Sequence, residues 1–135
     1  MELQVGVKVF LENKQGEFLL LHRNLKKYPD IQGTWDIVGG RIDIETPLVE
    51  NLEREVFEET GLTITSQPRL LYAQDIFVGE KNHIVRLTYR ATTEGVIVLD
   101  TSENDSCAWL TIDAMKEKDD LDIYIKDILD QNLLK

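Results

Sequence analysis

The most informative stretch of the sequence about the fold is Gly39–Leu62, which reads GGRIDIETPLVENLEREVFEETGL. Its two leading glycines permit a positive φ or a very close backbone approach. Pro47 suits a first helical turn, good helix formers continue to Thr60, and Gly61 suits the residue just after a helix. The segment therefore predicts a glycine-rich loop followed by a helix over 47–60.

Three carboxylates gather on one face of this expected helix. Glu55, Glu58 and Glu59 stand at i, i+3 and i+4, so they share a face within one turn and repel one another. An apolar seam at i, i+4 spacing runs beside them and should hold the helix on a sheet: Leu48, Leu52 and Val56. Taken alone, such a cluster is typical of a solvated helix face. A divalent cation would relieve the repulsion, and carboxylate oxygens are ligands that Mg²⁺ prefers.

The surroundings favour the metal site over the solvated face. Glycines, charges and aliphatic positions from Gly40 to Leu62, ending in Arg54-Glu55-Val56-Phe57-Glu58-Glu59-Thr60-Gly61-Leu62, together resemble the Nudix box. The preceding Gly33–Gly40 looks like the strand that leads into that box, and Cys107–Thr111 looks like the family's closing strand. The resemblance covers essentially the whole chain.

This resemblance implies an α+β fold, a Nudix α/β/α sandwich with a central mixed β-sheet. It also implies magnesium-dependent hydrolysis of the diphosphate linkage in a nucleoside di- or triphosphate or a nucleotide conjugate, with Mn²⁺ as an alternative ion. By position, Glu55, Glu58 and Glu59 would be metal ligands, and Arg54 would orient a carboxylate. Glu58, Glu59 and Arg54 thus become candidate catalytic residues.

Further candidates lie outside the central helix. Glu103 stands six residues before Trp109, where the family has another carboxylate, so it is a candidate base or extra metal ligand, although an ordinary acidic loop residue explains it equally well. Basic residues that could grip phosphates are Arg23, Lys26, Lys27 and Arg41, with Arg23 and Arg41 favoured, alongside the backbone of Gly39 and Gly40. Each of these cations is also compatible with a solvated surface charge.

The first half of the box departs from the family pattern. The family has a glutamate six residues after the glycine matching Gly40, whereas this chain has Thr46 there and Glu45 one place earlier. Either Glu45 substitutes or the role is absent, which leaves the general base unassigned. The alternative function is therefore a catalytically impaired Nudix-fold nucleotide-binding or sensor domain. A diphosphate isomerase of this fold would need a catalytic cysteine, and Cys107 lies in the wrong region.

Hydrophobic patterning predicts the remaining elements. Apolar residues alternate from Leu3 to Leu11, as in a strand, and further strands are expected at 18–21, 35–38, 70–78, 83–91, 96–99 and 108–111. The segment 79–82 should join two of them as a hairpin. Apolar residues at i, i+3, i+4, i+7 and i+8 predict a C-terminal amphipathic helix: Leu121, Tyr124, Ile125, Ile128 and Leu129. We expect one domain over 1–135.

Composition limits the partners. The chain has 135 residues, 42% of them hydrophobic, and a formal net charge of −10. An acidic surface repels phosphate backbones and anionic lipid, so nucleic acid and membranes are disfavoured as partners. With a single cysteine and no apolar leader, the chain is expected to be cytoplasmic. The expected partner is a small nucleotide, and the family also allows a homodimer; the sequence does not determine which nucleotide.

Overall fold

The computed structural model describes residues 2–135, within which eight strands form one mixed sheet. The strands are β1 (Glu2–Glu12), β2 (Phe18–Arg23), β3 (Trp35–Asp36), β4 (Val38–Arg41), β5 (Thr63–Ile64), β6 (Arg69–Val78), β7 (Asn82–Glu94) and β8 (Asn104–Leu110). The long central strand β1 runs parallel to β7 and antiparallel to β2 and β4. β5 and β6 pair with β7, while β3 and β8 pair with β2. The predicted mixed sheet is confirmed.

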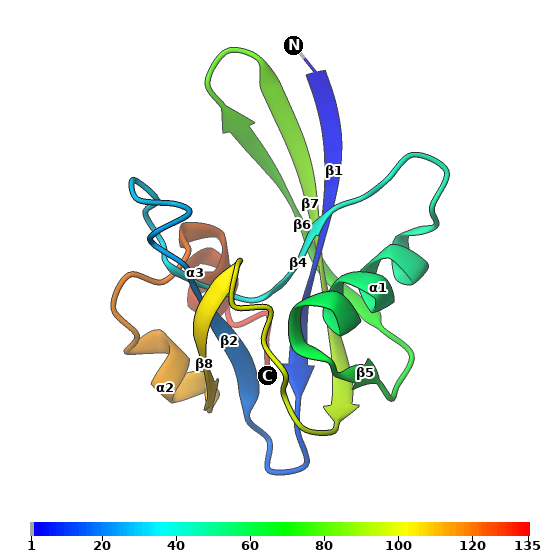
Figure 1. Ribbon diagram of the computed structural model, residues 1–135, viewed down its shortest axis with the longest axis vertical. Coiled ribbons are helices and arrows are strands. Elements are labelled where there is room, and N and C mark those ends of the chain that lie inside the picture. Colours follow the sequence, from blue (N-terminus) through cyan, green and yellow to red (C-terminus); the bar gives the residue numbers. More distant parts are fainter. Residues whose placement is uncertain (1) are drawn as a thin grey trace.

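Helices cover both faces of this sheet (Figure 1). α1 (Leu48–Thr60) lies on one side, and α2 (Ile112–Lys116) and α3 (Ile123–Asp130) lie on the other. Side chains alternate along β1, so Val7 and Val9 join the core under α1, whereas Phe10 joins the core under α2 and α3. The α/β/α sandwich implied by the family resemblance is therefore confirmed.

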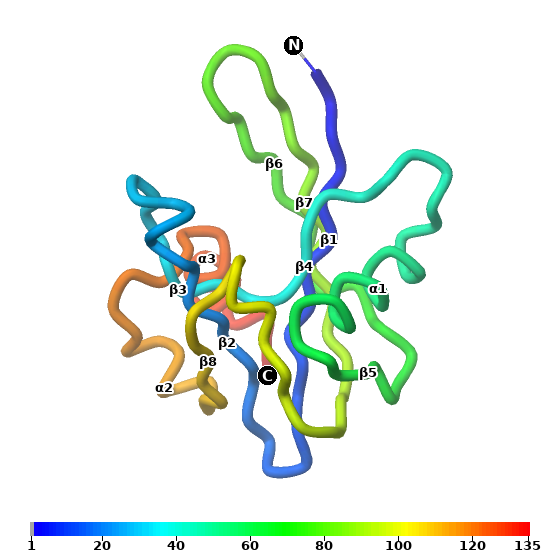
Figure 2. The backbone as a smooth tube through the Cα atoms, viewed as in Figure 1, coloured from blue at the N-terminus to red at the C-terminus, as the bar shows by residue number. Residues whose placement is uncertain are grey.

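The backbone trace in Figure 2 shows a long arm that extends beyond the helices. It consists of the β6–β7 hairpin and the beginning of β1, which pairs with β7 from Glu2 onward. The hairpin turn lies at 79–81, one residue shorter than the predicted connection at 79–82, because Asn82 already belongs to β7. None of the helices in the described chain is both long and apolar enough to cross a bilayer.

The helix predicted over 47–60 is confirmed within one residue. It begins at Leu48 with Pro47 as its N-cap, and Gly61 ends it in the left-handed conformation at φ 71°. Leu52 and Val56 of the apolar seam are fully buried. Pro47 and Gly61 therefore set the length of α1, and the buried seam determines which face of the helix carries the glutamates.

Several predictions of secondary structure were wrong, including the strand expected at 108–111, which runs from Asn104 to Leu110. Segment 96–99 is not a strand, because its backbone bonds the end of α1: Val98 N–H donates to the Thr60 carbonyl, and Asp100 N–H donates to that of Glu59. β2 continues through Arg23 instead of ending at Leu21, because β8 pairs with it up to that point. The short α2 and β5 were missed, since elements of five and two residues carry almost no periodicity.

Gly39 marks the closest backbone approach in the box. Its φ is 145°, and an added Cβ would lie 2.0 Å from the Val7 carbonyl oxygen on β1. We expect Gly39→Ala to lower the free energy of unfolding by about 3 kcal/mol, because strain and overlap with backbone act together.

Urea denaturation measures this effect, with Gly16→Ala as the matched control. Gly16 also has a positive φ, of 76°, but an added Cβ there meets nothing within 4 Å. An equal loss in both variants would mean that backbone strain alone, and not contact with β1, restricts position 39.

Candidate active site

One large cleft, of about 910 Å³, brings the predicted acidic and basic residues together. The glutamates of α1, namely Glu55, Glu58 and Glu59, line one side. The residues Arg23, Gly39, Gly40, Arg41 and Glu103, all expected from the sequence, also line it. Thus residues from β2, β4, α1 and the loop before β8 meet in one cavity, in a chain that is otherwise strongly acidic.

Two of the three glutamates are held in partly dry surroundings. Glu59 Oε2 accepts a hydrogen bond from Gly39 N–H at 3.1 Å, and burial raises the pKa of Glu59 to about 7. Burial also raises the pKa of Glu55, against the opposing effect of Arg54. An added Cβ at Gly40 would lie 3.2 Å from the Glu55 carboxylate, so the second glycine makes room for that side chain. Burial therefore disfavours the ionised form of both carboxyl groups.

Arg54 contacts acidic residues on both sides of the box. Its Nη2 lies 3.0 Å from Asp43 Oδ2 and 3.5 Å from Glu55 Oε1, and its Nη1 lies 3.8 Å from Glu58 Oε1. Nη2 also donates to Asn51 Oδ1 at 2.9 Å. Arg54 does not line the cleft, so its contacts are those of a residue that orients carboxylates.

A buried ionic cluster lines the cleft, and the sequence alone predicted only Arg23 among its members. Asp36, only 4% exposed, accepts at Oδ2 from Lys8 Nζ and Arg23 Nη2, both at 3.1 Å, and at Oδ1 from Arg86 Nη2 at 2.8 Å. Arg86 Nη1 also donates to Asp122 Oδ1 at 3.0 Å. Three cations thus surround one carboxylate, and the cluster keeps a net positive charge in the cleft.

Each charged group in this cluster is stabilised by its oppositely charged neighbours. Burial opposes the charge on Asp36, yet Lys8, Arg86 and Arg23 together hold its pKa well below the usual range. Burial lowers the pKa of Lys8, which Asp36 partly offsets. Burial likewise opposes the charge on Arg86, but Asp36 and Asp122 raise its pKa. The charged forms depend on one another, so removing one partner leaves the others buried without compensation.

Glu103 lies before β8 as predicted, but it is bound to the opposite loop. Lys27 Nζ pairs with Glu103 Oε1, and Tyr28 OH donates to Oε2 at 2.6 Å. These hydrogen bonds, from Lys27 first and then from Tyr28, lower the pKa of Glu103. In this arrangement Glu103 ties two loops together at the cleft edge.

The irregular part of the box lies away from the cleft. Glu45 is exposed, adopts a left-handed turn at φ 71° and does not line the cavity. Thr46 N–H closes the turn by donating to the Asp43 carbonyl. Glu45 therefore does not occupy the cleft position that a substitute for the missing box glutamate would need.

The donor set suits a hard divalent cation. Glu55, Glu58 and Glu59 offer only carboxylate oxygens from one helix face, and burial penalises two of these charges, a penalty that a bound cation would relieve. Across residues 2–135, no three His, Cys, Asp or Glu side chains already converge as a metal site. Glu59 instead turns to Gly39, and Glu55 lies near Arg54. The residues fit the ion in chemistry and location.

Of the missed cations Lys8 and Arg86, only Arg86 carried a weak signal in the sequence. Arg86 stands among apolar residues of β7, whereas Lys8 occupies a polar position of the alternation in β1 and therefore gives no such signal. A charged residue at an inward strand position is unusual unless it is paired. Neither position indicates its partner, because Asp36 lies 28 residues from Lys8 and 50 from Arg86.

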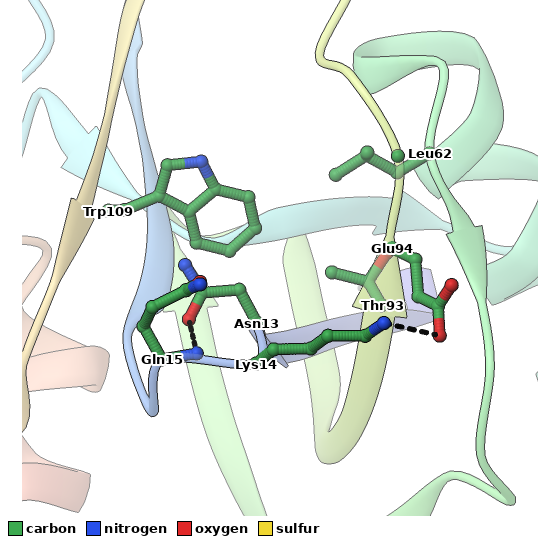
Figure 3. Close-up of a pocket in the computed structure, with 8 residues that line it drawn as sticks. Asn13, Lys14, Gln15, Leu62, Thr93, Glu94 and Trp109 are labelled. Carbon is green, nitrogen blue, oxygen red and sulfur yellow. Dashed lines mark hydrogen bonds and ion pairs between the residues drawn. The ribbon is translucent and has the colours of Figure 1, made fainter.

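A second cavity, of about 300 Å³, lies between Trp109 and Leu62 and is drawn in Figure 3. Its polar rim is formed by the β1–β2 turn and the end of β7, where Lys14 pairs with Glu94 at 3.8 Å. Glu94 is the single carboxylate among its lining residues, so it lacks the acidic cluster that hydrolysis of a diphosphate needs.

The fold and the cleft agree with the family comparison. The sequence profile of the NUDIX domain matches residues 2–131, and the chain belongs to this family. It is 28% identical over 86 residues to a MutT-like protein of Streptomyces ambofaciens, a match that covers 64% of this chain and 53% of the relative. It is also 26% identical over 133 residues to the m7GpppN-mRNA hydrolase NUDT17 of Danio rerio, covering 84% of this chain and 43% of the relative. The chain thus spans about half the length of these curated relatives.

Solved structures share the fold. The MutT NUDIX hydrolase from Burkholderia pseudomallei superposes with a TM-score of 0.81 at 24% identity, covering 97% of this chain and 98% of that one. The MutT protein from Methanosarcina mazei Go1 gives a TM-score of 0.80 at 23% identity, covering 96% and 91%. At these identities the likeness concerns the arrangement of the chain alone.

Proposed function

We propose that this chain is a Mg²⁺-dependent hydrolase that cleaves the diphosphate linkage of a nucleoside di- or triphosphate or of a nucleotide conjugate. The observation that carries the proposal is the single cleft in which the α1 glutamates face a cluster with net positive charge. Membership in the NUDIX domain family and the MutT-like relative add support. The domain boundaries of 1–135, the cytoplasmic location and a homodimer remain predictions.

The chain's own residues divide the work between two sides of the cleft. Glu55, Glu58 and Glu59 would hold Mg²⁺, which when bound neutralises phosphoryl oxygens and acidifies water. Arg54 would keep Glu55 and Glu58 oriented by the contacts described above. Arg23 and Arg41 reach the cleft and would bind the phosphates by charge-assisted hydrogen bonds.

The positions of the carboxylates limit which residue could act as general base in place of the missing box glutamate. Glu45 is outside the cleft, and Glu103 is engaged by Lys27 and Tyr28. Neither residue is therefore a free general base in the cleft. Because the cleft then holds no replacement for the glutamate that Thr46 displaces, a Nudix-fold binding or sensor domain is the second candidate function.

A phosphate-release screen separates the two functions. Nucleoside triphosphates, nucleoside diphosphate sugars and dinucleotides should be tested with Mg²⁺ and again with excess chelator. We expect turnover of at least one class with Mg²⁺ and loss of about 100-fold or more without it, since Arg54, which contacts the glutamates, does not line the cleft and cannot replace a metal ion on the phosphates. Binding of a nucleotide without turnover of any diphosphate would instead support the sensor domain.

A further inference from the structure

We propose that the part of the cleft above Gly6 is a specificity pocket in which Arg86 selects the oxo-bearing edge of a nucleobase. This inference rests on the proposed function, because it assigns the nucleoside part of that substrate. The pocket lies on the sheet away from the α1 glutamates, and it combines an open floor, apolar walls and one rigid cationic group. Its residues come from β1, β6, β7 and α3.

The open floor is a consequence of Gly6. In the parallel ladder Gly6 of β1 stands directly beside Arg86 of β7, and on β4 it pairs with Arg41. An added Cβ at Gly6 would meet only the Gly40 carbonyl oxygen and Ile84 Cγ2, both at 3.7 Å, which is ordinary contact. A larger side chain at position 6 would therefore occupy cleft space without forcing the strands apart.

The walls and the polar end suit a flat heterocycle. Ile84 lies beside Gly6, and Ile76, its partner on β6, and Val78, nearer the hairpin turn, line the same cleft and offer further apolar surface to a ring. At the inner side, Arg86 and Asp122 line the same cavity. A site with apolar walls and a few fixed polar groups is the usual design for orienting an aromatic ligand.

Arg86 is held too firmly to be a general phosphate contact. Only 5% of it is exposed, Asp36 and Asp122 bind its two terminal nitrogens, and the Tyr124 ring lies 5.7 Å from its guanidinium carbon. Asp122 is itself fixed, because it accepts from the first N–H groups of α3. The guanidinium consequently has one orientation in the pocket.

Arg86 also has unused donor capacity. Its Nε is buried and has no hydrogen-bond partner within residues 2–135, and each terminal nitrogen uses one bond to a carboxylate. A buried donor without a partner is costly, so an acceptor on a bound ligand would be favoured there.

The chemistry of guanidinium determines which bases fit. Arginine only donates, so a base edge with carbonyl oxygen is favoured, whereas an amino group would set two donors against each other. Guanine and uracil present such an oxygen on the edge where adenine and cytosine carry an amino group. The pocket should therefore prefer guanine and uracil nucleotides.

Gly6→Val tests the pocket without touching the glutamates. Kinetics with Mg²⁺ should compare GTP, UTP, ATP and base-free ribose 5-triphosphate. We expect the variant to raise KM for GTP and UTP roughly 10- to 200-fold with kcat near the parent value, and to raise KM for ribose 5-triphosphate far less, although Arg41 pairs with position 6. Leu3→Val, at an exposed position of the same strand, is the matched control and should behave as the parent. An unchanged KM for GTP in Gly6→Val would overturn the pocket while leaving the hydrolytic function standing.

Metal-free binding gives a readout that does not depend on turnover. By titration calorimetry, the parent should bind GMP and UMP about tenfold or more tightly than AMP and CMP. Gly6→Val should lose this binding, and Arg86→Lys should retain charge but lose the preference. If Arg86→Lys fails to fold, the loss of GMP and UMP binding in Gly6→Val still tests whether the pocket holds the base. Equal affinity of the parent for GMP, AMP and ribose 5-phosphate would overturn the inference, whereas selective GMP binding without any hydrolysis would support the pocket and refute the proposed function.

Discussion

Glu59→Gln should reduce kcat by about 100- to 10,000-fold while leaving the fold intact. Glutamine keeps an oxygen that can accept the Gly39 N–H, so the contact between α1 and the box loop survives. What is lost is a negative charge in partly dry surroundings on the metal-binding face. Since that charge is costly in the absence of metal, the chelated variant should be at least as stable as the chelated parent.

Steady-state kinetics and thermal denaturation with and without Mg²⁺ measure both effects. Mg²⁺ should raise the melting temperature of the parent and should raise that of Glu59→Gln much less, because a ligand stabilises only the state that binds it. Glu53→Gln is the matched control, since this exposed glutamate lies on the same helix but does not line the cleft. Parent-like turnover in Glu59→Gln would remove Glu59 from the proposed machinery.

The acidic half of the cleft could be predicted because its pattern is local. The glutamates of α1 lie within one turn, the apolar seam lies on the same helix, and Gly61 ends it. Helical period and capping rules therefore suffice to place the three carboxylates on one face. The glycine pair was also informative, because only a close approach such as that of Gly39 to Val7 requires it.

The basic half depends on long-range pairing that no local rule contains. Lys8, Asp36 and Arg86 come from three strands, and the sheet register alone brings them together. The same register decides that Gly6 faces Arg86. The strand predicted at 96–99 was wrong for a similar reason, because its apolar residues indicate a strand while its backbone instead bonds the end of α1.

Asp36→Asn should lower the free energy of unfolding by about 3–5 kcal/mol, the largest effect on stability that we expect. Both carboxylate oxygens accept hydrogen bonds: Oδ1 from Ile37 N–H and Arg86, and Oδ2 from Lys8 and Arg23. Asparagine has one carbonyl oxygen, so its amide group would face a cation as donor against donor. Lys8 and Arg86 would then be buried without their shared counter-charge.

The pH dependence of this loss has a definite sign. Because the pKa of Asp36 is depressed in the folded protein, its contribution is complete above the unfolded value, near pH 4, and declines as pH falls toward the folded value. Urea denaturation should thus give a constant difference between parent and Asp36→Asn from about pH 8 to 5, and a smaller one below about pH 4. Asp75→Asn, which removes an exposed pairing with His83, is the control and should cost about 1 kcal/mol or less. If Asp36→Asn cost no more than this control, the cluster would be a set of solvated charges, and the rigid orientation of Arg86 in the pocket would lose its physical basis.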